Sequence, residues 1–142
     1  MKRLLAILAL PLAFAALGAE DARLLVPMPA PAQAALREEM LDFMGALNEI
    51  IARLGEGKPA EAAAVADAKL GFPAMGRHRG SPPEAMPGRH MPAAMHEMGR
   101  SLHRLADEFA RTARKGDLAA SVAALQPVTA NCVACHLSYR IR

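Results

Sequence analysis

Apolar residues recur at intervals of three and four along most of the chain after residue 30, the spacing typical of helices that bury one face. This spacing predicts four helices, at about residues 32–54, 59–70, 92–114 and 117–139. In the first helix the repeating apolar residues are Leu36, Met40, Phe43, Met44, Leu47, Ile50, Ile51 and Leu54. In the third they are Met95, Met98, Leu102, Leu105, Ala106, Phe109 and Ala113. The second helix has a weaker apolar face.

Glycine, proline and one aspartate mark the ends of these helices. The segment Gly55-Glu56-Gly57-Lys58-Pro59 stops the first helix, and its proline suits the first position of the second. Gly116 ends the third helix, and Asp117 can cap the fourth. Pro127 lies inside the fourth helix and is expected to kink it or to end its first half.

The connections between the helices differ in length. Residues 24–31 are rich in proline and predict an extended leader, and residues 71–92 hold five prolines and predict a long loop without regular structure. The short connections predict antiparallel helix pairs. Alanine, leucine, methionine and arginine are plentiful, valine and isoleucine are sparse, and tryptophan is absent, which is a helical composition. We therefore predict an all-α fold, an antiparallel four-helix bundle with a long loop between its second and third helices.

The first residues have the pattern of a secretory signal. Met1-Lys2-Arg3 precedes an apolar run over residues 4–17, and Gly18-Ala19 precedes the acidic pair Glu20-Asp21. We expect residues 1–19 to be removed, with cleavage near Ala16 as an alternative, and residues 20–142 to form a single domain. A membrane anchor is the other interpretation, but the run is shorter than the roughly 20 residues that span a bilayer. No later apolar run is expected to be long enough, so we predict a soluble periplasmic protein.

Charge and composition argue against two classes of function. The formal net charge is +3, and loss of Lys2 and Arg3 would leave 15 basic and 14 acidic residues, a net charge of +1. No basic patch is interleaved with aromatic residues, so no nucleic-acid partner is expected. There is no glycine-rich phosphate loop, carboxylate cluster or serine–histidine–aspartate order to argue from, so we do not expect an enzyme.

The segment Cys132-Val133-Ala134-Cys135-His136 contains the only two cysteines of the chain. Two thiols three residues apart, with a histidine directly after the second, are typical of a c-type haem attachment site. On a helix both thiols face the same way and can reach the two vinyl groups on one porphyrin edge, and the imidazole can bind the iron. A redox dithiol or half of a zinc site are the alternatives, but no βαβ pattern is visible and two cysteines cannot form a four-cysteine site. We predict one covalent haem c, held by Cys132 and Cys135, with His136 as an axial ligand.

These features together resemble the cytochrome c′ / cytochrome c-556 family of four-helix proteins. The tail from Cys132 to Arg140 is similar to the family's Cys-x-x-Cys-His-x-x-Tyr/Phe-Arg, and Lys115-Gly116-Asp117 lies where the family has its third interhelical turn. The start of the first helix, Arg37-Glu38-Glu39-Met40-Leu41, is similar to the family's arginine followed by a methionine or leucine that faces the haem. The resemblance is weak in the 71–92 loop. It implies a cytochrome c′-like bundle over residues 20–142.

The resemblance leaves two branches open at the distal face of the iron. In cytochromes c′ an apolar residue of the first helix blocks this face, and small gases such as nitric oxide or carbon monoxide bind there. In the c-556 branch a methionine of the first helix is the sixth ligand, which suits electron transfer. The family's usual distal position corresponds to Leu41 here, but Met40 and Met44 share one helix face. We take Met40 as the candidate distal ligand and Met44 as the second choice, with plain core packing as the alternative for both.

The resemblance also assigns two arginines to the haem environment. It implies that Arg37 pairs with a haem propionate and that Arg140 packs on the proximal side near His136, whereas solvated surface arginines are the usual alternative. The predicted function is therefore single-electron transfer to periplasmic redox partner proteins, by a protein that could also form a homodimer. The alternatives are a five-coordinate gas-binding protein and a haem-free helical protein that binds a metal or a partner.

Methionine and histidine are concentrated in the long loop and the start of the third helix. The residues are Met75, His78, His90, Met91, Met95, His96, Met98 and His103. Thioether and imidazole groups are good copper ligands, but no spacing here defines a coordination set. Core methionines with exposed loop histidines, or contact of the loop with a partner protein, are the alternative interpretations.

Overall fold

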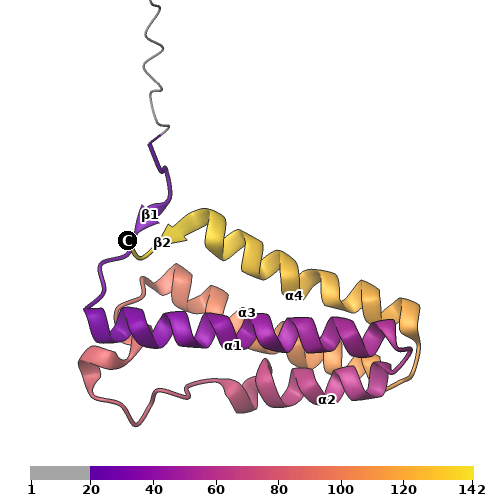
Figure 1. Ribbon diagram of the computed structural model, residues 1–142. Helices are drawn as coiled ribbons and strands as arrows, with labels where there is room; N and C mark the ends of the chain where they lie inside the picture. The colour runs from indigo at the N-terminus through magenta and orange to yellow at the C-terminus, as the bar shows by residue number, and fades with distance from the viewer. Residues whose placement is uncertain (1–19) are drawn as a thin grey trace, which may run out of the picture.

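The computed structural model describes residues 20–142, and these residues are mostly helical (Figure 1). Four α-helices pack together, which confirms the predicted all-α class. The proposed signal peptide lies outside the described residues. In chain order the elements are β1 Leu24–Leu25, α1 Ala30–Gly55, α2 Pro59–Lys69, three short 3₁₀ turns η1 Phe72–Ala74, η2 Pro83–Ala85 and η3 Pro87–Arg89, then α3 Ala93–Ala113, α4 Leu118–Ser138 and β2 Tyr139–Arg140.

The helix boundaries follow the local chemistry that the sequence indicated. The turn between α1 and α2 needs Gly57, whose φ is +71°, and the turn between α3 and α4 needs Gly116, whose φ is +83°. The carboxylate of Asp117 caps α4 by accepting a hydrogen bond from the Ala120 amide at 2.9 Å. α1 begins at Ala30, slightly earlier than predicted, because Pro31 is compatible with the first turn of a helix.

Pro127 does not end α4, so that alternative was wrong. The helix continues from Leu118 to Ser138 with the proline inside it. A proline at this position removes the N–H that would bond to the carbonyl of Ala123. Both Pro127 and Ala123 are exposed, so water can bond to that carbonyl instead.

The main core lies where α1 packs on α2, α2 on α3, and α3 on α4. Its largest fully buried side chains include Phe109, Ile50 and Leu70. Much of the rest is alanine, which lets helices approach closely: Ala46, Ala62, Ala63, Ala66, Ala106, Ala110 and Ala113 are all buried. The periodicity located this face correctly for Leu36, Phe43, Ile50 and Leu54, but Met44 and Ile51 are exposed.

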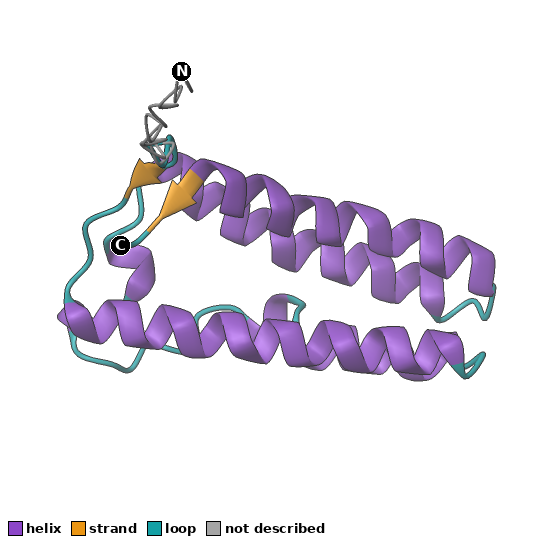
Figure 2. Ribbon diagram, turned by 45° about the horizontal axis from the view of Figure 1, so that its top comes forward, coloured by secondary structure: helices purple, strands orange, loops and turns teal. Residues whose placement is uncertain are grey.

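A second, smaller core closes the other end of the molecule, where β1 and β2 lie (Figure 2). The segment predicted as an extended leader is part of the fold. Leu24 and Leu25 pair in parallel with Tyr139 and Arg140, and the Val26 amide donates to the Arg140 carbonyl at 2.8 Å. Residues 23–28 therefore bind the segment that follows the Cys-x-x-Cys-His motif. We call the pairing of residues 23–28 with Tyr139 and Arg140 the β clasp.

α4 differs from the other helices in how little of it is covered. Only Ser121, Leu125 and Val128 are buried, because α4 packs on α3 and touches α1 at few places. It also carries no Asp, Glu, Lys or Arg, and by length and composition it is the one described helix apolar enough to cross a membrane. The expectation that no apolar segment after residue 19 is long enough to cross a membrane was therefore wrong. In the sequence of α4, small uncharged residues separate the larger apolar ones, so no continuous apolar run is visible.

The neighbouring residues Ile50 and Ile51 provide a test of this core. Ile50 is fully buried, so replacing it with alanine is expected to lower the free energy of unfolding by about 2–5 kcal/mol. Ile51 is 57% exposed, and its replacement is expected to change that free energy by less than about 0.5 kcal/mol. Urea denaturation followed by circular dichroism measures both, and equal losses would contradict this packing.

Candidate functional site

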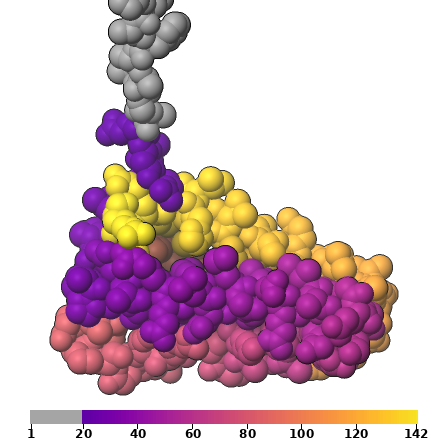
Figure 3. Space-filling model, viewed as in Figure 1, coloured from indigo at the N-terminus to yellow at the C-terminus, as the bar shows by residue number. Residues whose placement is uncertain are grey.

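A cavity of about 660 Å³ lies between α1, α3 and the C-terminal part of α4. In Figure 3 the yellow C-terminal segment lies beside the indigo start of α1 at this end of the molecule. The lining is mainly apolar, and the volume falls within the range of about 300–1,000 Å³ that is usual for cofactor and ligand sites. The cavity brings together residues from both ends of the chain: Arg37, Met40, Leu41, Met44, Cys132, Cys135, His136 and Arg140 all line it. These include every site residue predicted from the sequence.

Cys132 and Cys135 lie one helical turn apart on the face of α4 that lines the cavity. Both are free thiols and both are partly buried. Cys132 Sγ donates to the Val128 carbonyl at 3.4 Å. Burial raises the pKa of both thiols, and the charge of Cys132 contributes further to that of Cys135. At neutral pH both sulfurs therefore carry protons and face an apolar space.

The position of α4 over the cavity is fixed by Asn131, which precedes the motif. Its side-chain amide donates to the Met98 carbonyl of α3 at 3.0 Å. His136 follows the second thiol, lines the same cavity and is exposed. Its imidazole is therefore accessible from the cavity and from solvent, as an axial ligand must be before a cofactor is attached.

The two candidate distal methionines lie on the opposite wall, in α1. Met40 is partly buried and packs against both hydrophobic cores. Met44 is 66% exposed and Leu41 is 67% exposed, although both line the cavity. Met40 is thus held in place by neighbours on two sides, whereas Met44 and Leu41 lie at the margin. The choice of Met40 ahead of Met44 stays a prediction.

The two predicted arginines have different surroundings. The Arg37 guanidinium donates to the Gln33 side chain at 2.9 Å and lies on the cavity wall. Arg140 belongs to the β clasp: its Nε donates to the Arg23 carbonyl at 3.4 Å and lies 3.6 Å from an Asp21 carboxylate oxygen. Hydrogen bonds from Arg23, with a smaller contribution from the charge of Arg140, lower the pKa of Asp21 to about 2. The clasp therefore stays ion-paired at neutral pH.

His103 is a lining residue whose burial the sequence did not reveal. It is only 6% exposed, and its ring meets that of Phe43 edge-on with centroids 5.9 Å apart. Its Nδ1 lies 2.7 Å from the Leu70 carbonyl. A carbonyl only accepts, so Nδ1 carries a proton and donates it to Leu70. In the sequence, the signal for this burial was the position of His103 directly after Leu102 of the apolar stripe of α3.

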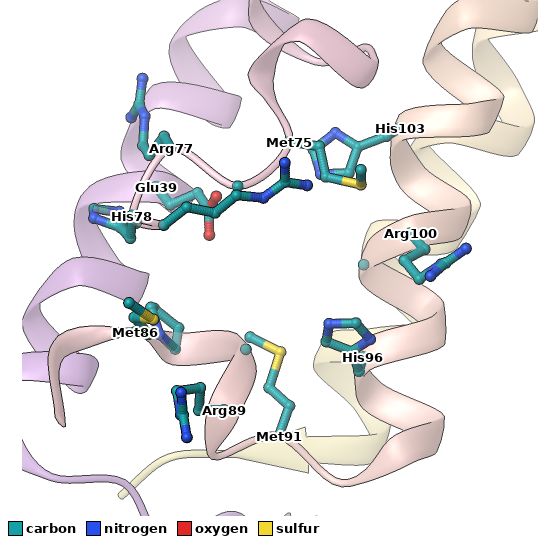
Figure 4. Close-up of a pocket in the computed structure, with 15 residues that line it drawn as sticks. Glu39, Met75, Arg77, His78, Met86, Arg89, Met91, His96, Arg100 and His103 are labelled. Atoms are coloured by element: carbon teal, nitrogen blue, oxygen red, sulfur yellow. The ribbon is translucent and has the colours of Figure 1, made fainter. Parts of the chain in front are cut away.

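The methionine- and histidine-rich residues are divided between two cavities. Met95 and Met98 line the large one, whereas Met75, His78 and His96 line a separate cavity of about 400 Å³ under the 71–92 loop (Figure 4). Glu39, Met91, Gly99 and His103 line both, and His90 lines neither. Within residues 20–142, no three His, Cys, Asp or Glu side chains are placed to hold a metal ion. The loop histidines also are not simply exposed, since His78 and His90 are partly buried.

Comparison of the chain with protein-family models, with curated proteins and with solved structures finds no match. The chemistry of the larger cavity must therefore be argued from its own residues. Two protonated thiols, one accessible imidazole and a methionine on the facing wall line a mainly apolar space. This set can hold a flat apolar group covalently on one side and provide a sulfur ligand from the other.

Glu39 gives a test of the wall between the two cavities. Burial raises the pKa of its carboxyl above the ordinary value of 4.5, against the opposing influence of His78, His103 and Arg77. Replacing Glu39 with glutamine is therefore expected to stabilise the protein at pH 7. The folded chain holds this proton more tightly than the unfolded chain. The free energy of unfolding of the wild type therefore rises as the pH falls through the folded pKa, and its difference from that of Glu39→Gln narrows.

Urea denaturation of both proteins at pH 7 and at pH 4 measures this difference. The exposed neighbour Glu38, replaced by glutamine in the same way, serves as the control. A difference for Glu39→Gln that stays constant with pH, or that matches the control, would contradict a desolvated carboxyl in this wall.

Proposed function

We propose that this protein is a periplasmic c-type cytochrome that transfers single electrons through one covalently attached haem. The observation that carries the proposal is the shared cavity: the Cys-x-x-Cys-His segment of α4 faces it from one side and Met40 of α1 from the other. Electron transfer of this kind needs no catalytic side chain, so we do not propose that the protein is an enzyme.

The residues of the cavity fit a haem by their chemistry. Each thiol would add its S–H across one vinyl double bond, forming a thioether without any oxidant. Cys132 and Cys135 are reduced, which this addition requires, and they lie on one helix face. His136 would bind the iron from the same helix. When bound, the haem would supply an iron that exchanges one electron between its ferrous and ferric forms.

The apolar lining suits electron transfer in a further way. Leu36, Leu47, Leu102, Met95 and Met98 line the cavity and make its surface mainly apolar. A thioether ligand from Met40 would stabilise the ferrous iron and raise its reduction potential. Met44, which is more exposed, remains the second choice. Arg37 would offer a guanidinium to a haem propionate.

The arrangement of the helices belongs to the same proposal. The close pairs α1–α2 and α3–α4, each joined by a short turn, support an antiparallel four-helix bundle of the kind found in the cytochrome c′ / cytochrome c-556 family. Export through the segment at residues 1–19, contact with a periplasmic redox protein, and a homodimer are further parts of the proposal that follow from the resemblance.

A five-coordinate, gas-binding protein is the second candidate function. It is favoured by Leu41, which lines the cavity one residue from Met40 at the position that the family uses for an apolar distal residue. In that case neither methionine would bind the iron, and the distal face would admit nitric oxide or carbon monoxide.

Covalent attachment can be tested by expressing the full chain together with a cytochrome c maturation system and measuring the mass of the periplasmic product. We expect the mass of the processed polypeptide plus one haem. Each single variant, Cys132→Ala or Cys135→Ala, should retain at most one thioether, and the double variant should yield the bare polypeptide. A bare mass for the wild type under these conditions would overturn the proposal.

The distal ligand can be tested with a matched pair of variants. In the haem-loaded protein, Met40→Ala is expected to convert a low-spin spectrum into a high-spin one and to lower the reduction potential, since the thioether is lost. Met44→Ala is expected to leave both nearly unchanged. A wild type that is already high-spin and shifts with carbon monoxide would instead establish the gas-binding alternative.

A further inference from the structure

The smaller cavity has a charge pattern that the proposed electron transfer does not use. Four arginines line it, Arg77, Arg79, Arg89 and Arg100, and Glu39 is the only acidic residue among its lining. Figure 4 shows side chains from α1, the 71–92 loop and α3 arranged around this one space. An excess of guanidinium groups around a concave site attracts anions and repels cations.

Two of these four arginines have a carboxylate partner in the described part of the chain and two do not. Arg77 pairs with Asp42, and Arg100 lies 3.6 Å from Glu97 in an exposed, loose pair. Among the described residues, Arg79 and Arg89 have no carboxylate within salt-bridge distance. The one carboxyl in the wall, Glu39, has its charged form disfavoured by burial. Two of the four positive charges that line the cavity, those of Arg79 and Arg89, are therefore without a paired carboxylate within residues 20–142.

One of these arginines, Arg79, lies against a glycine of the same loop. Gly76 has a φ of +77°, and a Cβ at that position would lie 2.3 Å from Arg79 Nε. The Arg79 side chain thus folds back over the glycine backbone, which no other residue would permit without displacement. The absence of a side chain at residue 76 therefore leaves the space that Arg79 occupies.

The cavity also contains a buried polar atom that lacks a partner. His78 Nε2 is buried and makes no hydrogen bond. Such atoms are rare in folded proteins, and they indicate a partner that the chain itself does not provide. His103, held through Nδ1 by the Leu70 carbonyl, forms a fixed part of the same wall.

We propose that this cavity is a binding site for a small organic anion with a phosphate or carboxylate head. The head would be held by Arg79, Arg89 and Arg100, with His78 as a further donor, because guanidinium groups bind such oxygens in forked geometry. The body of the ligand would contact the thioethers of Met75, Met86 and Met91, which adapt to irregular apolar groups. A copper ion, which the same methionines and histidines could coordinate, is disfavoured by the surrounding arginines.

The test uses the haem-loaded full chain and isothermal titration calorimetry with three probes. Phenyl phosphate carries both the head and the apolar body, inorganic phosphate carries only the head, and benzylamine carries a similar body with the opposite charge. We expect phenyl phosphate to bind more tightly than phosphate, and benzylamine not to bind. Added salt should weaken the binding, because the contact is electrostatic and partly exposed.

Variants locate the site. Arg89→Gln and Arg100→Gln are each expected to weaken phenyl phosphate binding by about tenfold, the usual effect of losing one charged hydrogen bond. Arg111→Gln, on the exposed face of the same helix α3 and outside the cavity, should have no effect. Glu39→Gln should bind at least as tightly as the wild type, since it removes the only opposing carboxyl.

The proposal would be overturned by no binding of either phosphate, by equal weakening with Arg111→Gln, or by binding of benzylamine in preference to phenyl phosphate. Tight binding of Cu(I) that the anions do not affect would also overturn it, in favour of a metal site. Repeating the titration with the haem-free double variant Cys132→Ala/Cys135→Ala separates the two proposals, because the small cavity uses neither thiol. Anion binding by this variant would support the site whatever the fate of the haem.

Discussion

The close contact of alanine-rich helix faces at one end of the molecule is the constraint on which the rest depends. Ala62, Ala63 and Ala66 of α2 and Ala106, Ala110 and Ala113 of α3 are buried in a single core near the two interhelical turns. Small side chains let these helices approach closely and fix their directions. At the other end the facing residues are methionine, leucine and phenylalanine, and α4 makes little contact with α1. Both cavities therefore lie beyond this alanine-rich core, toward the end of the molecule that the second core closes.

The two cavities have a direct chemical effect on the residues that line them. Burial keeps Cys132 and Cys135 protonated and disfavours the charge of Glu39, whereas the ion pairs of the β clasp lie at the surface and keep Asp21 charged. Protonated thiols thus face an apolar interior, and charge is concentrated at its margins and in the neighbouring cavity. Glu39, Met91, Gly99 and His103 form a wall that the two cavities share. A change in the packing of this wall therefore alters the shape of both cavities.

The sequence predicted most of the helices because their signals are local. Spacing of three and four located the buried faces, and Gly57, Gly116 and Asp117 act through their own backbone and side chains. Periodicity could not separate adjacent apolar residues such as Ile50, which is buried, and Ile51, which is exposed, because both follow Leu47 at a spacing of three or four. The motif around Cys132 indicated a site, and the facing residues of α1 came from a resemblance. The β clasp, the burial of His103 and the arginine-lined cavity depend on contacts between distant segments, which no local pattern encodes.

The β clasp has a consequence for the order in which the molecule is assembled. It joins Arg23 to Arg140, residues 117 positions apart, whereas each helix pair at the packed end is joined by a turn of a few residues. Contacts that are near in sequence form fastest, so the helical hairpins precede the clasp. Cys135 packs against the small core that the clasp helps to complete. The surroundings of its thiol are therefore complete only when the two ends of the chain have paired.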